Sequence, residues 1–339
     1  MLYVTTRSKI DSYTAHRALC DGFAADGGQF TPMRLPSFDE EQIDELCRRS
    51  FCGIIAEILN VFFSKKLTGW NIEFAIGRKP VKIAEIGQKM WIAEAWRNSD
   101  NNFDVSVDRI YNVLCGTGFG CKRASGWARI AIRIAFVFGF YAELSRLGID
   151  RFDFSVAGKD FEAGISVWYA RQMGLPIGVI ICGCNENCGI WDLLNKQQIN
   201  FNTQVINTTT PDMDDLNPAG VERLVYEYLG VEECSKYNQA FDSTTSYQLP
   251  ANGMKHFGPD MFSSVIGRNR VLDTIGSVYK TAGYMINPYL AIACAAVQDY
   301  RTVNGENSVT VLWSEQSAAQ YAQIISSCTG LPEKDIMNF

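Results

Sequence analysis

The feature that most constrains the fold is a strand–helix–strand pattern in the middle of the chain. Residues 152–157 (FDFSVA) predict a strand, residues 165–173 carry a helical pattern, and residues 178–184 (GVIICGC) form a short apolar run. Short apolar runs of this kind are typical of strands buried on both faces of a parallel sheet. The pattern therefore predicts an α/β fold. Ligands in such folds lie where a strand ends and the next helix begins, which makes residues 158–164 (GKDFEAG) the first candidate site.

Length and charge narrow the class of function. A chain of 339 residues forms one large or two ordinary domains. Its net charge of −6 and pI near 5.2 argue against a nucleic-acid partner, because phosphate neutralisation needs clustered Lys and Arg. The longest apolar stretch, residues 130–142, is too short for a bilayer and contains Arg133. With no visible secretory leader and eleven cysteines, we expect reduced thiols, a cytoplasmic location and no membrane partner.

Histidine and cysteine usage makes metal or nucleophilic chemistry improbable. The only two histidines, His16 and His256, leave little room for a Ser-His or Cys-His site. Cys182, Cys184 and Cys188 cluster at the end of the second strand, but zinc sites favour two-residue spacings and a fourth ligand. We therefore interpret these cysteines as small buried residues and expect no metal.

Three segments resemble the threonine synthase family of fold-type-II pyridoxal-phosphate (PLP) enzymes. They are the turn at residues 26–32 (DGGQFTP), residues 173–176 (MGLP) after the helix, and residues 185–187 (NEN) after the second strand. The resemblance implies a large α/β domain like that of the tryptophan synthase β subunit at residues 86–339. It also implies a small N-terminal domain at residues 1–85.

The loop that binds the cofactor phosphate in this family departs from the family pattern. The family has Ser/Thr-Gly-Asn-Phe-Gly, and here only the aromatic residue is kept. Glycine lets backbone amides approach a phosphate closely, whereas carboxylates repel it. The lysine in this loop leaves two alternatives open. Either it binds a small anionic ligand, or it pairs with the carboxylates of the same loop. The former phosphate loop consists of Gly158, Lys159, Asp160, Phe161 and Glu162.

The lysine that binds PLP in the family is also replaced. A gapless alignment puts Phe103 at its position and Asp104 at the aspartate that follows, and no lysine occurs between Lys89 and Lys122. An aromatic ring cannot form a Schiff base. We therefore expect no cofactor, and PLP only if the alignment is wrong and Lys89 or Lys159 reaches it.

Further departures fall at positions that contact substrate in the family. Gly126 replaces an asparagine at the start of a long helix, Tyr289 replaces a histidine, and residues 314–318 (SEQSA) replace a loop near the cofactor ring. Residues 115–125 stand where the family has its mobile small domain, so we expect that domain to be deleted. The resemblance assigns the substrate cleft to Asn185, Glu186, Asn187, Tyr289, Ser314 and Gln316.

Loss of the lysine, the phosphate loop and the small domain together predicts a pseudoenzyme. It would act as a binding or scaffold partner in amino-acid or natural-product metabolism. Deletion of the small domain would uncover an apolar face, so we expect a homo- or hetero-oligomer. One alternative is a working threonine synthase-type lyase that converts O-phosphohomoserine to threonine. Another is a PLP-independent enzyme in the same cleft, with Asp104, Asp160 or Glu162 as acid or base.

Overall fold

The central element of the computed structural model is a six-stranded sheet with the order β10-β7-β6-β11-β5-β4. Five strands are parallel, and β4 at one edge pairs with β5 in the antiparallel direction. The structure describes residues 1–78, 81–97, 100–118, 122–157, 161–251, 253, 255, 258–305 and 308–338. The strands are β4 (Lys82–Gly87), β5 (Met90–Glu94), β6 (Phe152–Val156), β7 (Ile177–Cys184), β10 (Met261–Val265) and β11 (Thr310–Ser314).

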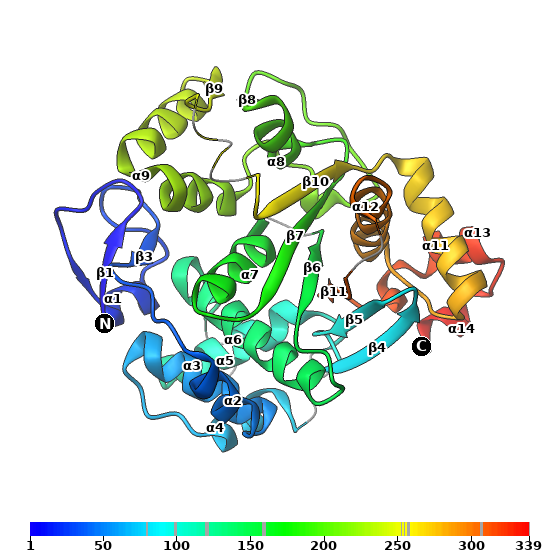
Figure 1. Cartoon of the computed structure of the whole chain (residues 1–339), viewed down its shortest axis with the longest axis horizontal. Helices are drawn as coiled ribbons and strands as arrows, with labels where there is room; N and C mark the ends of the chain where they lie inside the picture. Colours follow the sequence, from blue (N-terminus) through cyan, green and yellow to red (C-terminus); the bar gives the residue numbers. More distant parts are fainter. Residues whose placement is uncertain are drawn as a thin grey trace.

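Helices cover both faces of this sheet (Figure 1). On one face α12 (Pro288–Asn304) packs on four strands, and on the other α6 and α7 pack against each other and the sheet. The residues of α6 are almost all buried because the helix is apolar all round, as expected of a core helix. Apart from α12 and α9 (Ala219–Asp242), the α-helices that pack around this sheet or follow it are α5 (Phe103–Cys115), α6 (Gly126–Ser145), α7 (Glu162–Gln172), α8 (Gly189–Trp191), α11 (Arg268–Ala282), α13 (Ala322–Thr329) and α14 (Glu333–Met337).

The N-terminal part forms a three-stranded antiparallel sheet, β2-β1-β3, and four helices. The α3 helix packs on α6, and the hydroxyl of Tyr3 donates to the Phe62 carbonyl at 2.8 Å, so both parts share one hydrophobic core. The expected domain boundary at residues 85/86 falls inside β4. The elements are β1 (Leu2–Thr5), β2 (Tyr13–Thr14), α1 (Ala15–Cys20), β3 (Phe30–Pro32), α2 (Glu40–Cys47), α3 (Phe51–Phe63) and α4 (Gly69–Ile76).

One segment that the sequence predicts as a surface loop is helical. Residues 232–256 are polar, which favours a surface loop, but α9 (Ala219–Asp242) continues into them as far as Asp242. Gly230, with φ of 84°, kinks the helix, and Cys234 and Tyr237 in the second half are fully buried. A narrow buried stripe is thus enough to order a polar helix. After α9, β9 (Ser246–Gln248) pairs with β8 (Gln198–Asn200).

The predicted α/β class is confirmed, with a mixed sheet between helices. The chain passes from α5 to α6 through residues 116–125, the segment at which the small domain is predicted to be deleted. Gly116 ends α5 in the left-handed conformation. Of the helices in the described ranges, none combines the length and apolar character needed to cross a membrane.

Candidate functional site

The candidate site lies at the sheet edge where the parallel strands end. Because β6 and β11 are neighbours, the loops that follow them come together there. The loop after β6 leads to Glu162, the loop after β11 carries Glu315, and the first turn of α5 brings Asp104 beside both. This edge is the usual ligand crevice of open α/β sheets.

Phe103, at the predicted lysine position, points into the core. Its side chain has no exposed surface and packs edge-to-face on Phe136 and Trp313, with ring centres 4.7 and 5.7 Å away. Its backbone N–H donates to the Glu315 carbonyl at 2.8 Å, which fixes the start of α5. Any side chain at position 103 is therefore directed between α6 and β11.

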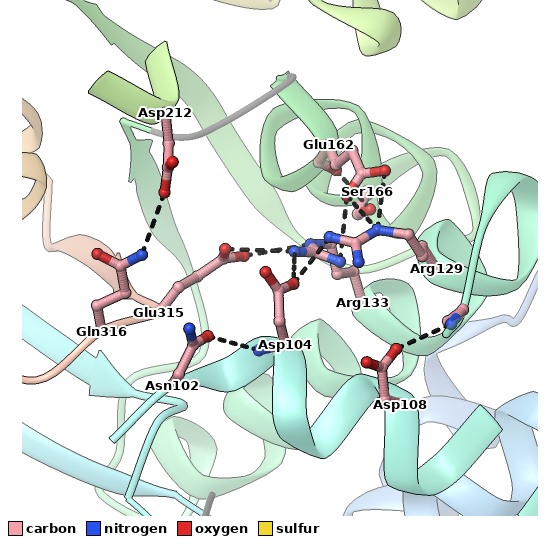
Figure 2. A network of polar contacts seen from close by, with 11 residues as sticks. Asn102, Asp104, Asp108, Arg129, Arg133, Glu162, Ser166, Asp212, Glu315 and Gln316 are labelled. Carbon is pink, nitrogen blue, oxygen red and sulfur yellow. Dashed lines mark hydrogen bonds and ion pairs between the residues drawn. The ribbon is translucent and has the colours of Figure 1, made fainter. Parts of the chain in front are cut away.

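Two arginines of α6 and three carboxylates fill the floor of the cleft (Figure 2). Arg129 lies 2.8 Å from Asp104 and 2.9 Å from Glu162. Arg133 lies 3.3 Å from Asp104, 3.3 Å from Glu162 and 3.2 Å from Glu315. We call these five residues the ion network. They come from α5, α6, α7 and the loop after β11, so the network joins four segments that are distant in sequence.

The ion network is partly buried, with the buried Arg133 at its centre, and its positive and negative charges are unequal in number. The Arg133 side chain is 2% exposed, and that of Glu162 is 13% exposed. Burial acts to lower the pKa of Arg133, but its three carboxylates hold that pKa above its ordinary value. Burial raises the pKa of Glu315, and Asp104 adds to this, although Arg133 opposes it. Two guanidinium groups against three ionised carboxylates leave one excess negative charge.

Glu162 takes the place that an anion would occupy at the start of α7. It is the acidic residue of the first turn, where the helix dipole stabilises negative charge. Phe161 precedes it with φ of 56°, and its ring lies under Gly164 so closely that a Cβ there would be 2.3 Å from the ring. Gly158, Lys159 and Asp160 of the former phosphate loop lie outside the described residues.

The polar groups of the loop after β11 bind protein partners. The Ser314 hydroxyl accepts from the Trp96 indole at 3.2 Å, and the Gln316 carbonyl accepts from Asn287 at 2.6 Å. The Gln316 side chain accepts from the Tyr321 hydroxyl and donates to Asp212 at 3.5 Å. These bonds hold the loop against the start of α12, the segment after β5 and Asp212.

Tyr289, the predicted histidine replacement, lies at this loop too. Its hydroxyl accepts from the Asp212 N–H at 3.1 Å, and burial raises its pKa, with Tyr321 adding to the effect. A tyrosine with a raised pKa stays neutral, so Tyr289 is a hydrogen-bonding group and not a base at neutral pH.

The segment after β7 orders a neighbouring loop. Asn185 donates to Asp214 at 2.8 Å and to Thr210 at 3.1 Å, and Asn187 donates to the same Asp214 carboxylate at 3.0 Å. Glu186 accepts from the N–H of Arg268, which opens α11, at 2.9 Å. A structural role accounts for all three side chains, and their assignment to a substrate cleft stays a prediction.

Two small cavities adjoin these residues. One, of about 30 Å³, is lined by Asp104, Tyr289 and Gln316 among others, and a second of about 30 Å³ lies over Phe161 and Cys184. A single water needs about 10–15 Å³, and small-molecule pockets are on the order of 300–1,000 Å³. Each cavity therefore holds only a few waters.

The described residues of the cleft do not fit PLP. Among the residues that line the two cavities there is no lysine. The alternative that Lys89 reaches the cleft is wrong: its carbonyl accepts from the Thr310 N–H, at the amino ends of β5 and β11. The five residues of β5 separate it from the cleft by roughly 13 Å. Glu162 moreover pairs with both arginines that lie beside α7, Arg129 and Arg133.

The cysteine cluster after β7 shows no sign of reactivity. Cys182 and Cys184 are buried, and burial raises the pKa of Cys182 well above its ordinary value and that of Cys184 to about 12. A thiol with a raised pKa is inert at neutral pH. Within the described ranges no group of three His, Cys, Asp or Glu side chains could hold a metal ion. His256 lies outside the described residues.

Sequence reasoning missed Arg129, Arg133 and Glu315. Arg133 was noted only because it interrupts an apolar run, yet an arginine inside a core helix must find carboxylate partners. That requirement was the one signal in the sequence that pointed to a buried ion pair around Arg133. It does not identify the partners, because Glu162 and Glu315 lie on segments far apart in the sequence.

Comparisons with known proteins agree with this architecture. Residues 2–78 match the family model "Threonine synthase N terminus". Over 214 residues the chain is 23% identical to "Threonine synthase-like 1" of Macaca fascicularis, covering 57% of this chain and 29% of that protein. It is 25% identical to threonine synthase of Pseudomonas aeruginosa over 246 residues, covering 68% of this chain and 52% of that protein. The chain thus spans between about a third and a half of the length of these relatives.

The fold is shared with solved threonine synthases. The PLP-bound enzyme from Brucella melitensis superposes with a TM-score of 0.86 at 17% identity, covering 98% of this chain and 92% of that one. The yeast enzyme gives the same TM-score at 16% identity, covering 100% and 94%. The fold-type-II prediction is confirmed by these superpositions. The chain thus has the fold of threonine synthases, its residues 2–78 resemble the N-terminal region of that family, and its sequence is similar to threonine synthases and threonine synthase-like proteins.

Proposed function

We propose that this protein is a threonine synthase-like pseudoenzyme that works by binding and not by PLP-dependent turnover. The observation that carries the proposal is the ion network, in which Glu162 occupies Arg129 and Arg133 at the start of α7. A phosphate dianion entering there would have to displace a partly buried carboxylate and face the excess negative charge of the network. Phe103 offers no amine, and its direction into the core supports the same conclusion.

Activity and cofactor binding test the proposal together. The purified protein, with and without added PLP, is incubated with O-phosphohomoserine while released phosphate is measured, and yeast threonine synthase serves as the positive control. We expect phosphate release at the level of the protein-free blank. Turnover that depends on PLP would instead establish the alternative, a working lyase, and would overturn the pseudoenzyme.

A PLP-independent activity in the same cleft is the second alternative. The carboxylates of Asp104 and Glu162 both pair with guanidinium groups, at 2.8 and 2.9 Å, so the contacts of both carboxylates are already used within the protein. We therefore rank a binding role above acid–base catalysis. Phosphate release without PLP that the double variant Asp104→Asn/Glu162→Gln abolishes would reverse this ranking.

We propose that the protein binds a partner protein in amino-acid or natural-product metabolism. In the simplest case this partner is a second copy of the same chain. Trp70 of α4 remains 69% exposed while stacking on Phe74 at 5.9 Å, an apolar feature of the kind found at interfaces. Light scattering should give a dimer or larger species that Trp70→Asp reduces. A monomer at high concentration would remove self-association from the proposal.

A further inference from the structure

The largest cavity beside the N-terminal sheet lies outside the cleft. Its volume is about 370 Å³, which is within the size range of small-molecule pockets. It is bounded by β3, α7, α9 and the N-terminal segment. None of its lining residues belongs to the ion network or to the two small cavities. The proposed function makes no use of it.

A carboxylate is held at the wall of this cavity. Glu227 of α9 accepts hydrogen bonds at 2.8 Å from the Thr31 hydroxyl and at 2.8 Å from the Tyr169 hydroxyl, both on the same oxygen, Oε1. Thr31 and Tyr169 are each 1% exposed, so the donors are fixed in place. The second oxygen, Oε2, receives no hydrogen bond from the described residues. Burial raises the pKa of Glu227, while the two neutral hydroxyls and the charges of Arg223 and Lys9 oppose that rise, and no ion pair within 4.0 Å joins Glu227 to either of these two described cations.

An ammonium group lies at the same cavity without pairing with that carboxylate. The Nζ atom of Lys9 lies 5.3 Å from the ring centre of Tyr226, and Lys9 lines the cavity together with Glu227. The two charges attract each other, but no ion pair within 4.0 Å joins these two described residues. A cation and an anion thus face one cavity and leave a gap between them.

We propose that this cavity binds a free α-amino acid with an apolar side chain. The ligand's ammonium would lie on the Glu227 carboxylate and its carboxylate on Lys9, which satisfies both charges with one zwitterion. A simple amine or a simple acid satisfies only one. The buried Val4, the half-buried Leu35 and the ring of Tyr226 supply apolar contacts for the side chain.

Calorimetry of the full chain with defined probes tests the proposal. The probes are L-leucine and L-methionine, compared with 3-methylbutylamine, which lacks the carboxylate, and 4-methylpentanoate, which lacks the ammonium. We expect saturable binding of at least one amino acid, and binding of each single-charge analogue weaker by about 10- to 100-fold, the effect of one lost charged hydrogen bond. No binding of either amino acid, or an amine that binds as well as L-leucine, would overturn the proposal.

Two variants locate the site. Glu227→Gln removes the charge but keeps an acceptor for both hydroxyls, and Lys9→Met removes an exposed ammonium, so neither should unfold the protein. Each should weaken amino-acid binding by about 10- to 100-fold. Lys236→Met is the matched control, because Lys236 is an exposed lysine of α9, the helix that carries Glu227, and it pairs with Glu233 away from the cavity lining. It should leave binding unchanged. Unaltered affinity in Glu227→Gln would contradict the assigned site.

Discussion

The guanidinium carbon of Arg133 lies 5.2 Å from the centre of the Phe103 ring. The ring thus contacts a cation on one side and Phe136 and Trp313 on others. Phe103 stands where the family's PLP lysine is expected, and Arg133 holds the carboxylates of the cleft. Position 103 and the ion network are therefore linked in space, since an ammonium at position 103 would meet the guanidinium group.

Restoring a lysine at position 103 should not restore a cofactor site. In Phe103→Lys an ammonium enters an apolar site against the Arg133 guanidinium, so we expect a loss of about 3–5 kcal/mol in the free energy of unfolding. Phe103→Leu, which only shortens the side chain, should cost about 1–2 kcal/mol. Urea unfolding measures both. A stable lysine variant that turns yellow with PLP would contradict the assigned direction of this side chain.

Removing the central cation should destabilise the protein strongly. Arg133→Met keeps most of the side-chain volume but leaves partly buried carboxylates without their partner, and we expect a loss of about 3–5 kcal/mol. Arg17→Met is the control: Arg17 pairs with Asp21 at 2.9 Å, but its side chain is 54% exposed, so the loss should be about 0.2–1 kcal/mol. Equal effects in urea unfolding would refute a partly buried network.

The excess negative charge predicts a pH dependence. Because burial raises the pKa of Glu315 in the folded state, the folded protein binds a proton that the unfolded chain has released. The contribution of Glu315 to stability is therefore greatest below its ordinary pKa of 4.5 and is lost as the pH rises through the raised value. Glu315→Gln should remove this slope. The measurement is the difference in unfolding free energy between the two proteins from pH 4.5 upward, and a constant difference would count against the assignment.

The glycine that replaces a family asparagine at position 126 cannot be reverted. A Cβ at Gly126 would lie 2.2 Å from the carbonyl oxygen of Gly22, and φ is 53°. We expect Gly126→Asn to cost about 1–3 kcal/mol. Gly116→Asn is a matched control, because φ is 68° there, nothing lies within 4 Å, and asparagine tolerates this conformation. Thermal unfolding should separate the two variants, and similar melting temperatures would show that the N-terminal segment moves aside.

The elements that the sequence predicts correctly have local causes. The strands β6 and β7 follow from apolar runs, and α3 begins after Ser50, whose side chain accepts from the Gly53 N–H as an N-cap should. The sequence predicts that Ser37 with Glu40 forms the capping box of α2, but in the structure Asp39 with Gln42 forms it. Both pairs satisfy the spacing rule, so the sequence pattern alone could not choose between them.

The first helix shows how a turn signal can mislead. The sequence predicts a helix that buries Phe23 and ends at residues 26–28, whereas α1 ends at Cys20 and Phe23 is 60% exposed. Gly27 does adopt a positive φ of 75°, but its turn is tied to β1 by the Thr5 hydroxyl, which donates to Asp26 at 2.6 Å. The glycines serve a strand contact and not a helix end.

The candidate site was predictable only in part. Asp104 and Glu162 were recognised because the family motifs place them, and the structure brings both onto Arg129. Their cationic partners could not be identified, since charge pairing between distant segments depends on how the helices pack. Whether a carboxylate repels a ligand or replaces it is thus decided by tertiary structure.

The most direct test of the central claim is an absorbance titration with PLP, followed by borohydride reduction and peptide mapping. We expect no saturable change in the spectrum and no stoichiometric pyridoxyl adduct on any lysine, including Lys159 of the former phosphate loop. Scattered substoichiometric labelling of surface lysines agrees with this expectation. A single lysine labelled to one equivalent per chain, with its chromophore bleached by borohydride, would contradict the account.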